Sequence, residues 1–425
     1  MYAAIAGLRT HMQNLNVIGN NVANVNTNGY KASRAVFKTS LYTTLTGGSN
    51  GTAVKGGVNP SQIGYGANVS TVDIDMSTGN YTVTGKSTDL MLDGDGFFLV
   101  GGKDIAETFR GDAEDVSRLT SLYLTRVGNF EFKADGYFAN NDGNCVYGFQ
   151  CVGRWGDANH PMTVGEGDAA TPNPDLPDGA KEGDPVFSDQ LVPIRFPQVK
   201  SETVWYEKQT DGALKKMETA PTADQLAGTD AEKYVSKEEM TIVYPTADKT
   251  GIHSVSEDGK ELPMGQFQLI TVDQNTGLIT GVSNETKEVV TIGCVAVGVV
   301  TNPNGVTSMG DNYFKASNGS GDLTVAVLGG NAEAMGIKQI NASLFDNGTP
   351  ADGADADAAE APAIDGLRPR TGGETKMLSN GLEMSKTDLA QEIANMILTQ
   401  RGYQANTRII TVTDSMLEEL VNMKR

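Results

Sequence analysis

The two strongest helical patterns of this chain lie at its two ends. Near the C-terminus an apolar residue recurs every seven positions from residue 389 to residue 417, and Ile393 and Val421 add a second apolar position at either end of this repeat. Near the N-terminus an apolar stripe with intervals of three or four runs through residues 5–25. Such spacings place side chains on one side of an α-helix. The sequence therefore predicts a long helix at each end.

We expect the apolar positions to pack the two helices against each other or against neighbouring copies of the chain. In the middle of the C-terminal helix the second position of the seven-residue repeat is polar, so the helix presents only a narrow apolar stripe. Such a helix would be only marginally stable by itself. Ser385 with Asp388 predicts a capping box at its start. The predicted helix-packing residues are Ile5, Leu8, Met12, Leu15, Ile18, Val22, Val25, Leu389, Ile393, Met396, Tyr403, Ile410, Leu417 and Val421.

Between the two ends the period of the apolar pattern changes to two. Val72, Ile74 and Met76 alternate with acidic residues, as in a half-buried strand, and the 50 glycines indicate many turns. Further strands are predicted at residues 81–83, 97–100, 122–127, 130–132, 145–152, 266–272, 289–300 and 323–328. The predicted fold is mixed and multi-domain. It is mainly antiparallel β, nested by insertion, with paired terminal helices forming a coiled-coil-like domain.

Changes in composition predict the domain boundaries. Residues 156–183 shift to Pro, Asp and Gly, and residues 46–66 are rich in Gly, Ser, Asn and Thr. Residues 348–366 consist almost entirely of Asp, Ala, Gly, Pro and Glu, which predicts a flexible acidic loop because such a segment buries little apolar surface. The predicted parts are a terminal helical domain (1–45 with 376–425), a linker or extended arm (46–66), a first β-rich domain (67–156 with 289–375) and an inserted outer β-rich domain (157–288).

Charge and hydropathy exclude two classes of partner. The net charge of −20 repels a phosphate backbone and an anionic membrane surface, so we expect no nucleic-acid partner. The longest apolar run, residues 289–300, is too short to span a membrane, so we expect no membrane insertion. Arg9 and His11 interrupt the first apolar run, which predicts no ordinary signal peptide. The chain then either stays in the cytoplasm or leaves by a route that reads an uncleaved N-terminus.

We find no supported active site, cofactor site or metal site in the sequence. Gly79 and the Gly-Lys-Ser at 85–87 resemble a phosphate-binding loop, but five residues separate the glycines where four are needed. The Asp-Gly-Asp-Gly at 93–96 has Phe97 where a calcium loop needs a third Asp or Asn and Asp104 where it needs Glu, and it is better explained as a hairpin turn. The three cysteines have no CxxC spacing, so we expect ordinary apolar packing.

Four segments together resemble one protein family. The first is Gly7-Leu8 leading to GNNVANVNTNGYK at 19–31, and the second and third are DLMLDGDGFFLV at 89–100 and LTRVGNFEFKADGY at 124–137. The fourth is LEMSKTDLAQEIANMILTQRGYQANTRIITVTDSMLEEL at 382–420. They cover about a third of the chain and resemble the axial proteins of the bacterial flagellum, a family of rod and hook subunits. Residues 157–288 form an insertion that the shorter rod members lack, which favours a hook subunit.

The resemblance implies a non-enzymatic subunit that polymerises with itself into a flexible helical tube. In the family this tube transmits motor torque from the rod to the filament. It further implies a location in the extracellular flagellar hook and basal body, and export by the flagellar type III machinery without signal cleavage. The implied partners are further copies of the chain, the distal rod, the hook cap and the hook–filament junction proteins. A distal-rod or other axial subunit is the alternative, with a surface β-rich adhesin or a hydrolase as more distant ones.

Overall fold

The chain is described here from a computed structural model, and it divides into two compact units. One unit comprises residues 1–82 with 383–425, and the other comprises residues 83–382. The structure describes residues 2–51, 55–103, 121–157, 160–164, 171–172, 181–208, 214–216, 234–248, 251–253, 262–321, 323–328, 340–342 and 375–423. The predicted acidic loop at 348–366 lies outside these described residues.

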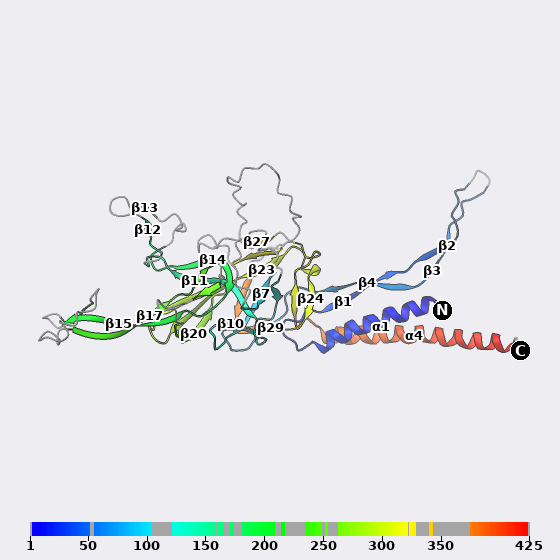
Figure 1. Ribbon diagram of the computed structural model, residues 1–425. Coiled ribbons are helices and arrows are strands. Elements are labelled where there is room, and N and C mark those ends of the chain that lie inside the picture. The colour runs from blue at the N-terminus through cyan, green and yellow to red at the C-terminus, as the bar shows by residue number, and fades with distance from the viewer. Residues whose placement is uncertain are drawn as a thin grey trace. The chain divides into compact units, whose positions relative to one another are not determined.

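The first unit contains both predicted terminal helices, which lie side by side (Figure 1). Helix α1 spans Tyr2–Ala23 and helix α4 spans Leu389–Met423. After α1 the chain turns through Gly29, whose φ of +68° is left-handed and favours glycine.

The N-cap of helix α4 is Asp388, the residue before Leu389, rather than Ser385 as the predicted capping box requires. The Asp388 carboxylate accepts hydrogen bonds from the backbone N–H groups of Ala390 (3.0 Å) and Gln391 (3.2 Å), so it satisfies two amides of the first turn. Ser385 accepts instead from the Thr387 amide, before the helix.

Two hairpin-like strand pairs complete the helical unit. Strand β1 (Ser33–Thr39) pairs antiparallel with β4 (Ala67–Ile74), and β2 (Tyr42–Thr46) pairs antiparallel with β3 (Ser61–Gly64). Strand β3 lies within residues 46–66, whose composition suggested a linker or extended arm, whereas β2 ends at the first residue of that segment. Residues 33–74 are therefore called the arm below.

The second unit is built on one antiparallel sheet of fourteen strands. The strands of its main path are hydrogen-bonded in the order β20-β21-β22-β11-β7-β23-β26-β27. Off this path, β14 and β10 also pair with β11, β9 pairs with β10, β8 pairs with β7, β25 pairs with β8, and β24 pairs with β25. The bounds are β7 (Phe97–Gly101), β8 (Tyr123–Thr125), β9 (Glu131–Phe132), β10 (Phe138–Ala139), β11 (Cys145–Arg154), β14 (Pro185–Pro193), β20 (Phe267–Val272), β21 (Leu278–Ser283), β22 (Val289–Val295), β23 (Val297–Val300), β24 (Thr307–Gly310), β25 (Tyr313–Lys315), β26 (Leu323–Ala326) and β27 (Ile340–Ala342). Strands β14, β20 and β21 come from the predicted insertion (157–288), and they belong to the same sheet as β7 and β11.

Smaller sheets account for the remaining described strands. A three-stranded sheet has the order β16-β15-β17, and the pairs are β12-β13, β18-β19, β28-β6 and β29-β5. Their bounds are β5 (Tyr81–Val83), β6 (Leu90–Asp93), β12 (Thr163–Val164), β13 (Thr171–Pro172), β15 (Gln198–Lys208), β16 (Leu214–Lys216), β17 (Tyr234–Val243), β18 (Thr246–Asp248), β19 (Gly251–His253), β28 (Lys376–Ser379) and β29 (Gly381–Glu383), and a short 3-10 helix η3 spans Pro303–Gly305.

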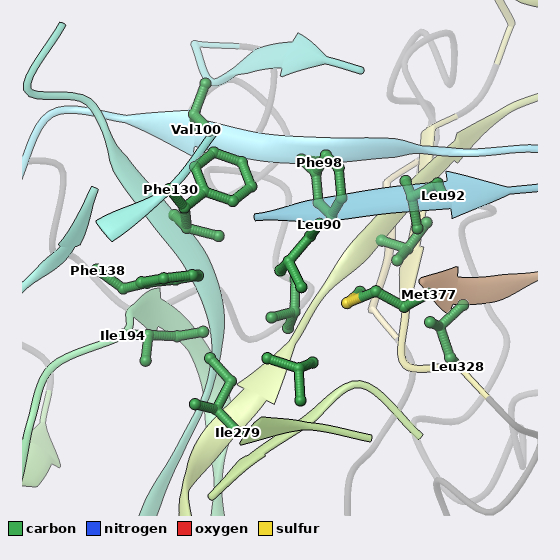
Figure 2. Packing of buried hydrophobic residues seen from close by; sticks show 14 of the residues in the cluster. Leu90, Leu92, Phe98, Val100, Phe130, Phe138, Ile194, Ile279, Leu328 and Met377 are labelled. Atoms are coloured by element: carbon green, nitrogen blue, oxygen red, sulfur yellow. The ribbon is translucent and has the colours of Figure 1, made fainter. Parts of the chain in front are cut away.

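The core of the second unit is apolar and aromatic. Figure 2 shows side chains from β6, β7, β10, β21 and β28 pointing toward one another, with Phe98 and Phe130 in edge-to-face contact at 5.1 Å between ring centroids. Burial of these side chains supplies the main driving force for folding this unit.

The turn at residues 93–96 differs from the prediction. It joins β6 to β7, but β6 pairs with β28 and β7 pairs with β8, β11 and β23, so the two strands do not form a hairpin. The buried Arg126 guanidinium donates to the carbonyls of Leu92 (3.1 Å) and Gly94 (2.6 Å) and thereby holds this turn. The two glycines adopt φ values of +127° and +122°, which explains their presence.

The three cysteines are buried and carry free thiols, as expected for apolar packing. Burial raises the pKa of Cys151 to about 12 and also raises that of Cys294. Within the described part of the chain, none of the helices has the length and apolar character needed to cross a membrane.

Candidate assembly site

The two terminal helices pack against each other through small and polar residues. The contacting residues pair in antiparallel order, with equal steps along each helix. The pairs are Gly7 with Asn406, His11 with Gly402, Asn14 with Thr399, and Asn21 with Glu392. Helix α1 begins at Tyr2, so this register leaves the last turns of α4 beyond the end of α1 (Figure 1).

Glycines on both helices allow the close approach. A Cβ atom on Gly7 would lie 2.6 Å from Nδ2 of Asn406, and a Cβ atom on Gly402 would lie 2.7 Å from the His11 ring. Asn14 Nδ2 donates to Thr399 Oγ1 at 2.9 Å, and Asn21 Nδ2 donates to Glu392 Oε1 at 3.0 Å. Along each helix these residues are four, three and seven positions apart, spacings that keep them on one side of the helix.

The predicted helix-packing residues take no part in these four pairs. On α1, Ile18 is buried, Ile5, Leu8, Leu15, Val22 and the following Val25 are half-buried, and Met12 is exposed. On α4, Met396 and Ile410 are half-buried, whereas Leu389, Ile393, Tyr403, Leu417 and Val421 are exposed. At 3.6 residues per turn, the α4 seam lies roughly a quarter turn around the helix from the residues that contact α1. Their role in assembly stays a prediction.

Helix geometry places the two apolar stripes on one side of the helix pair. Each stripe lies about a quarter turn from the contact residues in the same rotational sense, and because the helices are antiparallel both stripes face the same way. On the opposite side of α1, Thr10 Oγ1 donates to the Ala67 carbonyl of β4 (3.0 Å) and Asn21 donates to the Ser33 carbonyl of β1 (2.7 Å). The pair therefore has one face covered by the arm and one apolar face that is not.

Helix α4 exposes apolar side chains on other sides as well. Ile397, Leu398 and Val412 lie off the seam and are exposed. Residues 414–423, past the end of α1, are exposed without interruption and include Met416, Leu420 and Met423. A helix that is apolar on several sides is normally enclosed by neighbours. Within the described residues of this chain, α1 is the helix packed along α4.

Asn21 joins four elements of the helical unit. Its side chain is 1% exposed, donates to Ser33 O and Glu392 Oε1, and accepts from the Ser33 amide (2.9 Å) and the Tyr30 hydroxyl (3.0 Å). Burial raises the pKa of Tyr30, which keeps this hydroxyl a proton donor. Asn21 thus fixes α1 to β1, to the turn after α1 and to α4.

A buried ion pair also joins distant segments of the helical unit. Lys31 Nζ lies 2.6 Å from Oε1 of Glu383, and the same ammonium donates to the Ser77 carbonyl at 2.8 Å. The Gly79 amide also donates to Glu383 Oε1, at 2.6 Å. A Cβ atom on Gly79 would lie 2.4 Å from the Met384 carbonyl, so glycine is required there. The segments after α1, after β4 and before α4 therefore meet at one point.

Sequence reasoning missed most of these contact residues because they are polar or small. Apolar periodicity cannot find a helix interface made of Asn, Thr, Gly and His. The available signal was the density of asparagines in GNNVANVNTNGYK and the Gly402 and Asn406 positions of QRGYQAN. Among the described residues, no group of three or more His, Cys, Asp or Glu side chains is arranged to hold a metal ion.

The fold and this site define a structural subunit whose terminal helices present an uncovered apolar surface. The first 31 residues match the family model for flagella basal body rod proteins, and residues 378–423 match the model for the C-terminal part of flagellar basal body rod FlgEFG proteins. The two ends of this chain are therefore similar to those of flagellar rod and hook proteins.

Relatives align over nearly the whole chain. The flagellar hook protein FlgE of Borreliella burgdorferi is 24% identical over 502 aligned residues, covering 100% of this chain and 99% of that protein. The flagellar basal-body rod protein FlgG of Bacillus subtilis is 26% identical over 425 residues, covering 100% and 98%. Hook proteins of Salmonella typhimurium and Escherichia coli align over similar shares. The solved hook protein FlgE2 of Helicobacter pylori matches 61% of this chain and 98% of its own, at 12% identity and a TM-score of 0.26.

Proposed function

We propose that this chain is a structural subunit of the bacterial flagellar hook that self-assembles into a helical tube through its terminal helices. The observation that carries the proposal is the exposure of apolar side chains on several sides of α4, including Met416, Leu417, Leu420, Val421 and Met423 near its end. A surface of this kind is stable in water only when neighbours cover it. Contacts between different surfaces of successive copies, repeated by a rotation that does not close, produce an open helical polymer.

The hook assignment rests on the relatives that carry that name and align over essentially the whole chain. In this role the tube would transmit torque from the rod to the filament while bending. It would contact the distal rod, the hook cap and the hook–filament junction proteins. Export would proceed through the flagellar type III machinery with an uncleaved N-terminus. The function is mechanical, and no catalytic step is part of it.

A distal-rod subunit is the second candidate, supported by the full-length match to the Bacillus subtilis rod protein. The two functions differ in the shape of the polymer. Electron microscopy of the purified protein after the salt concentration is raised, which screens the net charge of −20, separates them. Curved tubes favour a hook and straight tubes favour a rod. Absence of any polymer under all salt conditions would overturn both.

A pair of matched variants tests whether the α4 surface drives assembly. Tyr403→Asp places a charge on the exposed apolar face of α4, whereas Met309→Asp places one on an exposed apolar side chain of β24 in the second unit. We expect Tyr403→Asp, and likewise Ile410→Asp, to abolish tubes while far-ultraviolet circular dichroism of the strands is unchanged. Met309→Asp should leave tubes intact. Tubes of normal length from Tyr403→Asp would contradict the proposal.

A further inference from the structure

A three-stranded sheet in the second unit is joined to the fourteen-stranded sheet at a narrow root. Among the described strands, β16, β15 and β17 are hydrogen-bonded to one another and form a sheet of their own. Two backbone hydrogen bonds join the base of β15 to the segment before β20, from the amide of Val199 to the carbonyl of Pro263 (3.0 Å) and from the amide of Gly265 to the carbonyl of Pro197 (3.3 Å). Residues 197–199 and 263–265 are called the root below.

Burial in this small sheet is concentrated at its root. Val199 is 5% exposed, and Gly265 is buried. Beyond the root, the described side chains of β15 and β17 are exposed or half-buried, and Met240 on β17 is 47% exposed. Local stability follows the number of buried contacts that must be broken. Few such contacts therefore oppose a movement of the small sheet about the root.

Gln198 lies in the centre of the root and is completely buried. Its backbone forms a single antiparallel bridge with Met264, between the two hydrogen bonds of the root. Its side chain is 0% exposed, and within the described part of the chain neither Oε1 nor Nε2 has a hydrogen-bond partner. An amide that gives up water without gaining a partner is costly to bury. The closed root is therefore less stable than its backbone hydrogen bonds suggest.

A second buried glutamine of the same unit shows the ordinary arrangement. Gln150 on β11 is also 0% exposed. Its Nε2 donates to the carbonyls of Arg195 (2.9 Å) and Ile292 (2.9 Å), and its Oε1 accepts from the Arg195 amide (2.9 Å). Buried side-chain amides are normally bonded in this way. The unpaired amide of Gln198 is thus a property of the root and not of buried glutamines in this fold.

We infer that the root is a hinge, which opens locally in the folded chain and lets water reach the Gln198 amide. Opening breaks the two backbone hydrogen bonds of the root, but it hydrates an amide that the closed root leaves unpaired. The open and closed forms are therefore closer in free energy than they would be with an apolar residue at this position. The small sheet can then change its angle to the fourteen-stranded sheet while both stay folded. The inference goes beyond the proposed function, because it concerns a movement within one chain.

Native-state hydrogen exchange of the full-length, unpolymerised chain tests the hinge, because backbone amides exchange when the root opens. Gln198→Met keeps the length of the side chain and removes both unpaired polar groups. We expect it to slow exchange of the Val199 and Gly265 amides about tenfold, which corresponds to ~1.4 kcal/mol in favour of the closed root. The Ile194 amide, which donates to the Val146 carbonyl (3.0 Å), is the internal reference and should keep its rate.

Gln150→Met is the matched control, because it removes a buried amide that is fully bonded. The backbone groups of Arg195 and Ile292 would lose their hydrogen bonds to this side chain. The urea midpoint of the second unit should therefore fall in Gln150→Met, whereas Gln198→Met should keep or raise it.

A distance measurement tests the movement itself. Ser236 on β17 and Asn275 in the turn between β20 and β21 are both exposed, and each is replaced by a cysteine that carries a nitroxide label. The three native thiols are buried. Double electron–electron resonance should give a broad distribution of distances between the two labels, and addition of Gln198→Met should narrow it.

Three outcomes would overturn the inference. The first is exchange at Val199 and Gly265 that is equal or faster in Gln198→Met, which is expected if the amide permanently binds an internal water molecule. The second is a distance distribution of the same width with and without this substitution. Gln198→Leu is a second apolar variant in case the Met variant does not fold. Unfolding of both is the third outcome, because it would show that the fold needs bonds made by the amide.

Discussion

Lys31 Nζ lies 2.6 Å from Glu383 Oε1, and both side chains are 1% exposed although 352 residues separate them in the sequence. A buried ion pair contributes little net stability when intact, but removal of one partner leaves an uncompensated charge in the interior. The pair thus makes the helical unit depend on both ends of the chain at once.

We expect Lys31→Met to destabilise the helical unit by about 3–5 kcal/mol. The Glu383 carboxylate would remain buried, with the Gly79 amide still donating to it but without the opposite charge. Urea unfolding of the full chain, followed by hydrogen exchange of the backbone amides in residues 27–32, measures the change. The double variant Lys31→Met/Glu383→Met should be less destabilised than the single one. Equal loss in both would contradict the account, and the exposed Lys38→Met is the control.

Asn21→Ala should destabilise the contact of α1 with β1 and α4 by about 1–3 kcal/mol. The substitution leaves the Ser33 amide and carbonyl and the Tyr30 hydroxyl without their partner in a buried place. Asn16→Ala removes an exposed side-chain amide elsewhere on α1 and is the matched control. Chemical denaturation monitored by circular dichroism at 222 nm compares them. Similar midpoints for the two variants would argue against a central role for Asn21.

Two glycines of α1 should respond in opposite ways to a larger side chain. Gly7→Leu would force α4 away, because even a Cβ atom there lies 2.6 Å from Asn406 Nδ2. Gly19→Leu should be tolerated and should stabilise the helix by about 0.5–1 kcal/mol, because a Cβ atom there meets nothing within 4 Å and glycine is unfavourable in a helix interior. Thermal unfolding of the two full-length variants checks this. A lower midpoint for Gly19→Leu than for Gly7→Leu would refute it.

The buried thiols should be unreactive at pH 8 in the folded protein. Burial raises the pKa of Cys151 to about 12, above the value near 8.5 of an exposed thiol, so the fold favours the protonated form. This contribution to stability is complete below about pH 8.5 and falls as the pH rises beyond it, because the unfolded thiol ionises first. We expect no labelling by iodoacetamide at pH 8 and labelling of all three cysteines in urea. Rapid labelling of the folded chain would contradict the predicted burial.

The elements of the fold were largely predictable because each has a local signal. Periods of three, four and seven predicted α1 and α4, and alternation with glycine-rich turns predicted strands such as β7, β11 and β20. The continuous run at 289–300 was predicted as one strand, but the structure divides it into β22 and β23 at Ala296. Residues 93–96 were predicted as a hairpin turn, but strand partners are set by distant segments such as β28, which the sequence pattern does not reveal.

The sequence by itself determined that the chain ends in two helices and is β-rich between them, since periodicity is a local property. The tertiary structure alone decided which faces of those helices meet. Helices α1 and α4 contact each other through polar residues, and Gly7 and Gly402 allow them to lie close together. The apolar stripe that the sequence predicted for packing lies about a quarter turn around each helix from this contact. The physical reason is that polar groups inside a contact must find hydrogen-bond partners, and only the folded chain brings Asn14 to Thr399 and Asn21 to Glu392.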